Sequence, residues 1–134
     1  MGIPWVEVFA VFVVCHLAGD FILQTEFQAT NKHGALTGTG RQRWALGSHA
    51  LTYTGCFAPA FVWIASDGNV TALGLVAAVL GVIVPHALQD DGRAIRWWMR
   101  RVKHTEVAPG ILAIMVDQSF HMVALLLLAI LVGG

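Results

Sequence analysis

The 134-residue chain has little charge, and its charges balance. Only 12% of its residues are Asp, Glu, Lys or Arg, and eight basic residues match eight acidic ones. A soluble domain carries about 25% charged residues. The low fraction argues against a soluble globular protein. The balance leaves no positive excess to attract a nucleic acid, so we expect no nucleic-acid partner.

Cysteine is also scarce. The two cysteines, Cys15 and Cys56, lie in apolar runs and have no CxxC or other paired spacing. This arrangement predicts neither a disulfide framework nor a thiolate metal site. We interpret both as small buried apolar side chains.

Apolar residues make up 57% of the chain and gather in four runs. The runs cover residues 4–23, 46–65, 70–88 and 109–132. A membrane helix needs about 20 apolar residues, and lipid offers no partner to an open strand edge. We therefore predict an all-α fold, a single integral membrane domain over residues 1–134 built as a bundle of four transmembrane helices.

The basic residues lie in two of the three connections between these runs. Residues 66–69 join the second and third runs, whereas all eight Lys and Arg fall in the first and third connections. In a chain with four spans, those two connections lie on the same side of the membrane. The positive-inside rule then predicts a multi-pass protein of the plasma membrane, with the long connections in the cytoplasm and both termini outside.

The third connection contains an amphipathic pattern. In residues 92–104, apolar side chains fall at i, i+3, i+4 and i+7 from Ile95, and basic side chains fill the remaining arc. We predict a cytoplasmic interfacial helix here, between the third and fourth spans. Its basic face either binds anionic membrane lipids or places Arg93 or Arg96 against a substrate phosphate. Asp91, just before this helix, is interpreted as a solvated residue.

Seven His and Asp side chains lie in the apolar runs or directly after one of them. On insertion scales a charged residue costs about 2.5–3.5 kcal/mol at the centre of a membrane helix, so each is expected to have a partner or a function. Three runs carry a His and an Asp four residues apart, which places both on one helix face. The seven residues are His16, Asp20, His49, His86, Asp90, Asp117 and His121. All lie in the part of the bundle nearer the basic connections.

Four imidazoles and three carboxylates in one half of a bundle predict a metal site. Buried charges are costly unless an opposite charge balances them. Neutral His and ionised Asp suit a divalent ion, with Zn²⁺ as the first choice and Fe²⁺ or Mn²⁺ as alternatives. Seven donors are too many for one tetrahedral ion, so we predict one or two ions. The alternative is a hydrogen-bond network that only holds the helices together.

Further roles follow from this interpretation. Asp117 and Asp20 are the candidate catalytic carboxylates, because one Asp beside a metal-bound water can accept its proton. Three neutral residues are expected to orient the ligands through hydrogen bonds. They are Gln24, Tyr53 and Gln118, which adjoin the charged residues or lie one or two turns from them.

Three short motifs lie along the chain: H-x-x-x-D-F-x-x-Q-T at residues 16–25, H-A-L-T-Y at residues 49–53 and D-Q-S-F-H at residues 117–121. Together with Asn31-Lys32 and the His86/Asp90 pair, they resemble the small bacterial membrane proteins of the domain of unknown function 3307 family. The resemblance covers nearly the whole chain. It implies an inner-membrane protein with a site at these residues, and a distant likeness to membrane proteins called metal-dependent hydrolases.

Three functions fit these residues. The first is a metal-dependent hydrolase that acts on a lipid-linked phosphate or acyl substrate. The second is a divalent-metal or proton-coupled transporter, which with four helices and no inverted repeat would have to work as a homo-oligomer. The third is a non-catalytic membrane subunit whose polar network is structural. The outer half is almost wholly apolar, which favours a site open to one side, as in an enzyme.

The expected topology determines which positions an impermeant reagent reaches. A cysteine placed at Lys103 should be shielded from an impermeant thiol reagent in intact cells, whereas a cysteine placed at Asp67 should react. Labelling before and after lysis measures both. Reaction at Lys103 together with protection at Asp67 would invert the orientation.

Overall fold

The computed structural model describes residues 2–105 and 110–133. Within these ranges the chain forms helices and no β-strand, which confirms the expected all-α fold. The elements are α1 (Trp5–Leu17), the π-helical turn η1 (Ala18–Ile22), α2 (Glu26–Asn31), the 3₁₀ turn η2 (Ala35–Thr37), α3 (Gly40–Cys56), α4 (Ala58–Ser66), α5 (Ala72–Asp90), α6 (Arg93–Arg101) and α7 (Ile111–Val132). Residue 109, the expected start of the last run, lies outside the described residues.

Three helical segments are long and apolar enough to cross a membrane: residues 5–22, α5 and α7. The expected run at 46–65 is instead divided between α3 and α4, which are separated by Phe57. Pro59 lies at the start of α4. Because proline has no N–H and its ring clashes with the preceding turn, it favours a helix start over a helix interior at this place. The second run is therefore not one continuous helix.

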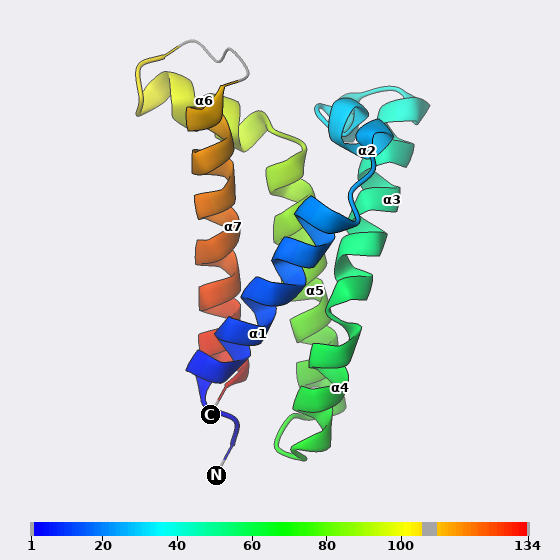
Figure 1. Cartoon of the computed structure of the whole chain (residues 1–134), viewed down its shortest axis with the longest axis vertical. Coiled ribbons are helices and arrows are strands. Elements are labelled where there is room, and N and C mark those ends of the chain that lie inside the picture. The colour runs from blue at the N-terminus through cyan, green and yellow to red at the C-terminus, as the bar shows by residue number, and fades with distance from the viewer. Residues whose placement is uncertain (1, 106–109, 134) are drawn as a thin grey trace.

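The connections gather at one end of the bundle. Figure 1 shows α2 and α6 at the end opposite both chain termini, while the turn between α4 and α5 lies at the terminal end. α1 crosses the bundle obliquely and packs against α7, and α5 packs against both α3 and α7. All eight Lys and Arg fall between residues 32 and 103, in the two connections and in the first turn of α3. The basic residues and the termini therefore lie at opposite ends.

An apolar core fills the bundle towards the terminal end. It is centred on Phe12, Phe57 and Phe61, whose ring centroids lie 5.4–6.4 Å apart. Buried side chains from α1, α4, α5 and α7 complete it. Aromatic pairs at such separations add to the free energy of apolar burial. This core leaves the polar residues to the other half of the bundle.

α6 is amphipathic as expected, and the protein itself covers most of its apolar face, although Val102 is exposed. Ile95 and Met99 are buried, and the ring of Trp98 packs edge-on against Phe120 of α7 with centroids 5.2 Å apart. The basic side chains Arg100 and Arg101 are exposed. α6 is therefore fixed against the first turns of α7.

The position of Asp20 depends on the close approach of its neighbour Gly19 to α3. A Cβ added to Gly19 would lie 2.6 Å from Cδ2 and 3.3 Å from Cα of Tyr53 in α3. The π-helical turn around Gly19 contains a hydrogen bond between residues five apart, from the N–H of Leu23 to the carbonyl of Ala18 at 3.0 Å. Such turns rotate the following side chains relative to a regular α-helix. Asp20 is thereby brought next to α3.

Replacing Gly19 with Ala should destabilise the protein by about 1–3 kcal/mol, because the Tyr53 backbone cannot retreat without moving α3. Gly55→Ala is the matched control, since a Cβ there meets no atom within 4 Å and α3 gains helix propensity. Thermal unfolding in detergent compares the two variants. Equal midpoints would contradict the importance of this approach.

Candidate metal centre

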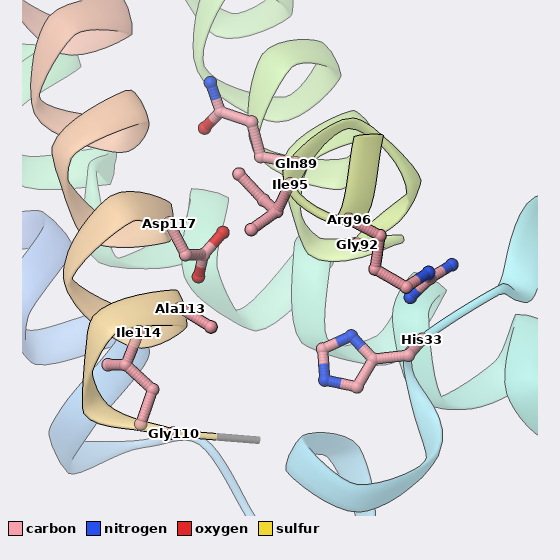
Figure 2. Close-up of a pocket in the computed structure, with 9 residues that line it drawn as sticks. All are labelled: His33, Gln89, Gly92, Ile95, Arg96, Gly110, Ala113, Ile114 and Asp117. Carbon is pink, nitrogen blue, oxygen red and sulfur yellow. The ribbon is translucent and has the colours of Figure 1, made fainter. Parts of the chain in front are cut away.

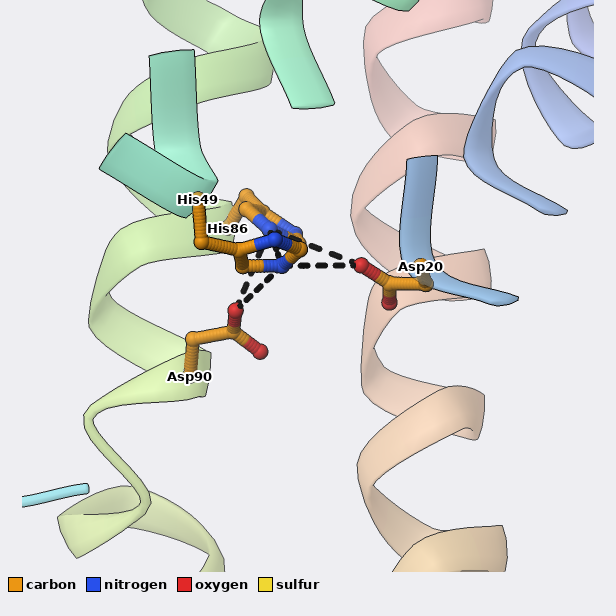
Figure 3. Close-up of side chains that lie close together, drawn as sticks. All are labelled: Asp20, His49, His86 and Asp90. Atoms are coloured by element: carbon orange, nitrogen blue, oxygen red, sulfur yellow. Dashed lines mark hydrogen bonds and ion pairs between the residues drawn. The ribbon is translucent and has the colours of Figure 1, made fainter. Parts of the chain in front are cut away.

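Four buried side chains from three parts of the chain converge between the helices. Asp20 comes from η1, His49 from α3, and His86 and Asp90 from α5. One ligand atom from each lies within 4.8 Å of the other three. Figure 3 shows the two imidazoles close together, with the Asp20 carboxylate to their right and the Asp90 carboxylate below them. We call these residues the first group.

The spacing of the ligand atoms in the first group suits a small cation. His49 Nε2 lies 3.1 Å from His86 Nε2, 3.1 Å from Asp20 Oδ1 and 3.0 Å from Asp90 Oδ2. His86 Nε2 lies 3.2 Å from Asp90 Oδ2 and 3.7 Å from Asp20 Oδ1. Ligands bound at about 2.0–2.1 Å to a tetrahedral Zn²⁺ are about 3.3 Å apart. The first group therefore surrounds a space of the right size for such an ion.

Hydrogen bonds alone do not account for this crowding. His49 Nε2 also lies 2.9 Å from Gln24 Nε2, so four polar atoms surround one ring nitrogen that can make one hydrogen bond. The Nδ1 atoms of His49 and His86 are buried with no hydrogen-bond partner among the described residues. Packing orients the His86 ring instead, because Tyr53 stacks on it with centroids 3.4 Å apart and planes at 4°.

A second group shares Asp90 with the first. It contains Asp90, Asp117 and His121, again with ligand atoms within 4.8 Å of one another. His121 Nδ1 donates to the Asp117 carbonyl at 3.0 Å, so Nε2 keeps its lone pair. That Nε2 lies 3.7 Å from Asp90 Oδ1, and both atoms are buried without a hydrogen-bond partner in the described part of the chain. Asp90 thus faces the first group with Oδ2 and the second with Oδ1.

Lys32 is a residue of the cluster that the sequence analysis missed. Its side chain is 10% exposed, and its Nζ donates to Asp90 Oδ2 at 2.8 Å. The next residue, His33, donates from Nδ1 to the Asp90 carbonyl at 3.1 Å. Lys32 lies in a polar connection, where a lysine is ordinarily solvated. Its place in the Asn31-Lys32 motif is the one sequence signal that could have marked it.

The charges of the cluster fit one divalent ion. With neutral imidazoles, the carboxylates of Asp20, Asp90 and Asp117 and the ammonium of Lys32 leave two net negative charges. One divalent ion balances this charge, which would otherwise be costly inside the bundle. The first group is the better place for it, because it offers four buried ligands.

Asp91 is not solvated, so that interpretation was wrong. Its side chain is buried and accepts hydrogen bonds from the Leu36 N–H at 2.8 Å and from Arg93 Nε at 2.5 Å. The Gly34 N–H also donates to its carbonyl at 2.8 Å. The first connection folds back over the end of α5 and covers Asp91. This clamp keeps Lys32 beside Asp90.

His16 lies beside the cluster but in neither group. Its Nδ1 accepts from the Tyr53 hydroxyl at 3.0 Å, and its Nε2 donates to Gln118 Oε1 at 2.8 Å. Both ring nitrogens are therefore used. His16 Nδ1 lies 3.7 Å from Asp20 Oδ2, so the expected convergence of the two side chains is loose. The reason is that the π-helical turn begins at Ala18, between the two residues, and changes the direction of Asp20. Gln118 links the two, since its Nε2 donates to Asp20 Oδ2 at 3.4 Å.

A cavity of about 260 Å³ adjoins the second group, between α5, α6 and α7. Figure 2 shows Asp117 on one wall, with Arg96 and His33 across from it. The Asp117 side chain is 27% exposed, whereas the other residues of both groups are buried. The second group therefore opens into the cavity through Asp117. Arg96 lines it, but Arg93 is paired with Asp91.

The fold and these groups define a small all-α protein with membrane-length helices and a buried His/Asp cluster that could hold a metal ion. The chain belongs to the family described as protein of unknown function (DUF3307), whose profile matches residues 8–133. This match confirms the resemblance noted in the sequence, and it includes every residue of both groups. Comparisons with curated proteins and with solved structures found no match.

We expect the purified protein to carry one divalent ion per chain, held by the first group. His86→Ala should remove the ion, because a ligand of that group is lost. His121→Ala should retain it, and so should His16→Gln, whose ring nitrogens are hydrogen-bonded elsewhere. Elemental analysis by mass spectrometry of the detergent-purified variants measures the content. A full ion content in His86→Ala would rule out the first group as the binding place.

Proposed function

We propose that this protein is a membrane-embedded, metal-dependent hydrolase that acts on a lipid-linked phosphate or acyl substrate. The observation that carries the proposal is the position of Asp117. Its carboxylate belongs to the second group and also lines the cavity. A substrate in the cavity would therefore lie next to the His/Asp cluster, as a metal-assisted hydrolysis requires.

In this proposal the chain crosses the membrane four times. Residues 5–22, α5 and α7 form three of the crossings, and α3 and α4 together form the second one in chain order. The separation of basic connections from termini fits an even number of crossings. Trp44 and Trp97, exposed by 68% and 59%, lie near the basic end, where aromatic side chains suit a membrane interface. By the positive-inside rule this end faces the cytoplasm, so the cavity would open towards the cytoplasmic interface.

The cluster would hold a divalent ion, which supplies Lewis-acid polarisation and an activated water when a ligand position stays open. Asp90, which belongs to both groups, links the buried ligands to the side of the cluster that opens into the cavity. Asp117 is the residue placed to accept the proton of the attacking water, because it reaches both the cluster and the cavity. The water oxygen bonds to the phosphorus or acyl carbon, and the bond to the lipid oxygen breaks. That oxygen takes a proton and leaves as the alcohol. One water is consumed for each ester bond cleaved.

The transporter alternative needs a polar path to the terminal end of the bundle. Beyond the cluster, the described interior consists of the apolar core around Phe12, Phe57 and Phe61. The alternative of a purely structural network is disfavoured by Asp90 Oδ1 and His121 Nε2, which have no hydrogen-bond partner among the described residues, since buried polar atoms in a structural network are ordinarily satisfied. The first argument favours a site open to one side, and the second favours a bound ligand.

Asp117→Asn should lower turnover by about 10²–10⁴-fold while the ion stays bound, because the amide cannot accept the proton. Asp67→Asn, in the turn at the terminal end, is the control and should be fully active. Metal-loaded protein is assayed against phospholipids, isoprenoid phosphates and acyl esters for released product. Metal uptake into proteoliposomes is measured in parallel, and uptake without any hydrolysis would favour the transporter.

A further inference from the structure

We infer that the cavity between α5, α6 and α7 binds the phosphate monoester head group of a single-chain lipid, with Arg96 as its anchoring cation. The inference rests on the proposed function and narrows its substrate class from phosphate or acyl to phosphate. Two features of the cavity carry it: a guanidinium without an ion-pair partner among the described residues, and an apolar exit.

Arg96 is a half-buried cation without a counterion in the described part of the chain. No carboxylate of residues 2–105 or 110–133 lies within ion-pairing distance of its guanidinium, whereas the neighbouring Arg93 is bound to Asp91. A guanidinium presents a planar fork of donors that matches phosphate oxygens, and it is stabilised by an anion when partly buried. An uncharged acyl ester offers Arg96 no such partner.

Gln89 lines the cavity with an amide of fixed orientation. Its Nε2 donates to the Phe120 carbonyl at 3.3 Å. Its Oε1 is buried, so it presents no surface to the cavity. The cation of this wall is therefore Arg96. A phosphate monoester supplies anionic oxygens for its guanidinium, and an acyl ester has none.

The size and walls of the cavity fit a head group and not a whole lipid. Its volume of about 260 Å³ lies below the 300–1,000 Å³ common for pockets that hold entire small ligands. Ile95, Ala113 and Ile114 form an apolar part of the lining. Ile114 is also 56% exposed on the outside of α7. An alkyl chain can therefore leave the cavity past Ile114 into the surrounding lipid.

Gly92 keeps the cationic wall of the cavity in place. Its φ of +76° is a conformation that glycine adopts without strain. A Cβ at this position would lie 2.9 Å from Arg96 Nη1 and 3.0 Å from His33 Nδ1. The absence of a side chain lets Arg96 and His33 approach each other beside the cavity.

The test uses dodecylphosphonate, whose carbon–phosphorus bond cannot be hydrolysed, so that binding is measured independently of turnover. Binding to the metal-loaded protein in detergent is followed by calorimetry, with dodecanol and inorganic phosphate as the other ligands. We expect dodecylphosphonate to bind more tightly than either. Arg96→Gln should weaken it about 10- to 100-fold, because a charge-assisted contact is lost. Arg100→Gln, an exposed charge on the same helix, should leave it unchanged.

Equal losses in Arg96→Gln and Arg100→Gln, or unchanged binding in Arg96→Gln, would overturn the inference. Equal affinity for inorganic phosphate would overturn the lipid-linked assignment. If dodecylphosphonate binds tightly and Arg96 is needed for it, but dodecyl phosphate is not hydrolysed, the phosphate-binding cavity is supported and the proposed hydrolase activity is rejected. Hydrolysis confined to acyl esters, without phosphonate binding, would reject the phosphate site and leave the hydrolase in place.

Discussion

The polar side chains of this protein are arranged around the carboxylate of Asp90. One oxygen accepts from Lys32 and lies within 3.2 Å of the His49 and His86 ring nitrogens, while the other faces His121. A buried carboxylate is costly unless charges and donors surround it. The first connection, α3, α5 and α7 must therefore all keep their places around this one group.

That requirement explains the division of the bundle into two halves. At the end of α5, the first connection is clamped by Asp91 to the Leu36 N–H and the Arg93 side chain. At the other end, stacked phenylalanines and aliphatic side chains form a core without charge. The polar groups are concentrated near one face, and the apolar half closes the path to the opposite face. Such an arrangement suits chemistry at one interface better than passage across the membrane.

The cavity connects this cluster with the outside of the bundle. Asp117 reaches it from the cluster, and Arg96 faces it from α6. An anionic substrate would lie between the Arg96 guanidinium and the ion that the cluster is proposed to hold.

Local patterns were enough to predict the helical fold, the apolar runs and the residue types of the buried cluster. The four-residue spacing of His86 and Asp90, and of Asp117 and His121, identifies side chains that share a helix face, and the structure places each pair in one group. The same spacing was less informative for His16 and Asp20, because the intervening π-helical turn changes their relative direction. Helical periodicity predicts faces only while the helix stays regular.

The sequence by itself therefore determined that this protein is helical, apolar and rich in buried His and Asp, because composition and periodicity act within one segment. The tertiary structure alone decided that Lys32 is buried against Asp90, that Asp91 is covered by the first connection, and that Arg96 and not Arg93 lines the cavity. Lys32 and Asp90 are 58 residues apart, and Leu36 and Asp91 are 55 apart. No local pattern encodes such pairs, since they form when a polar connection folds back over a distant helix end to satisfy its buried charge.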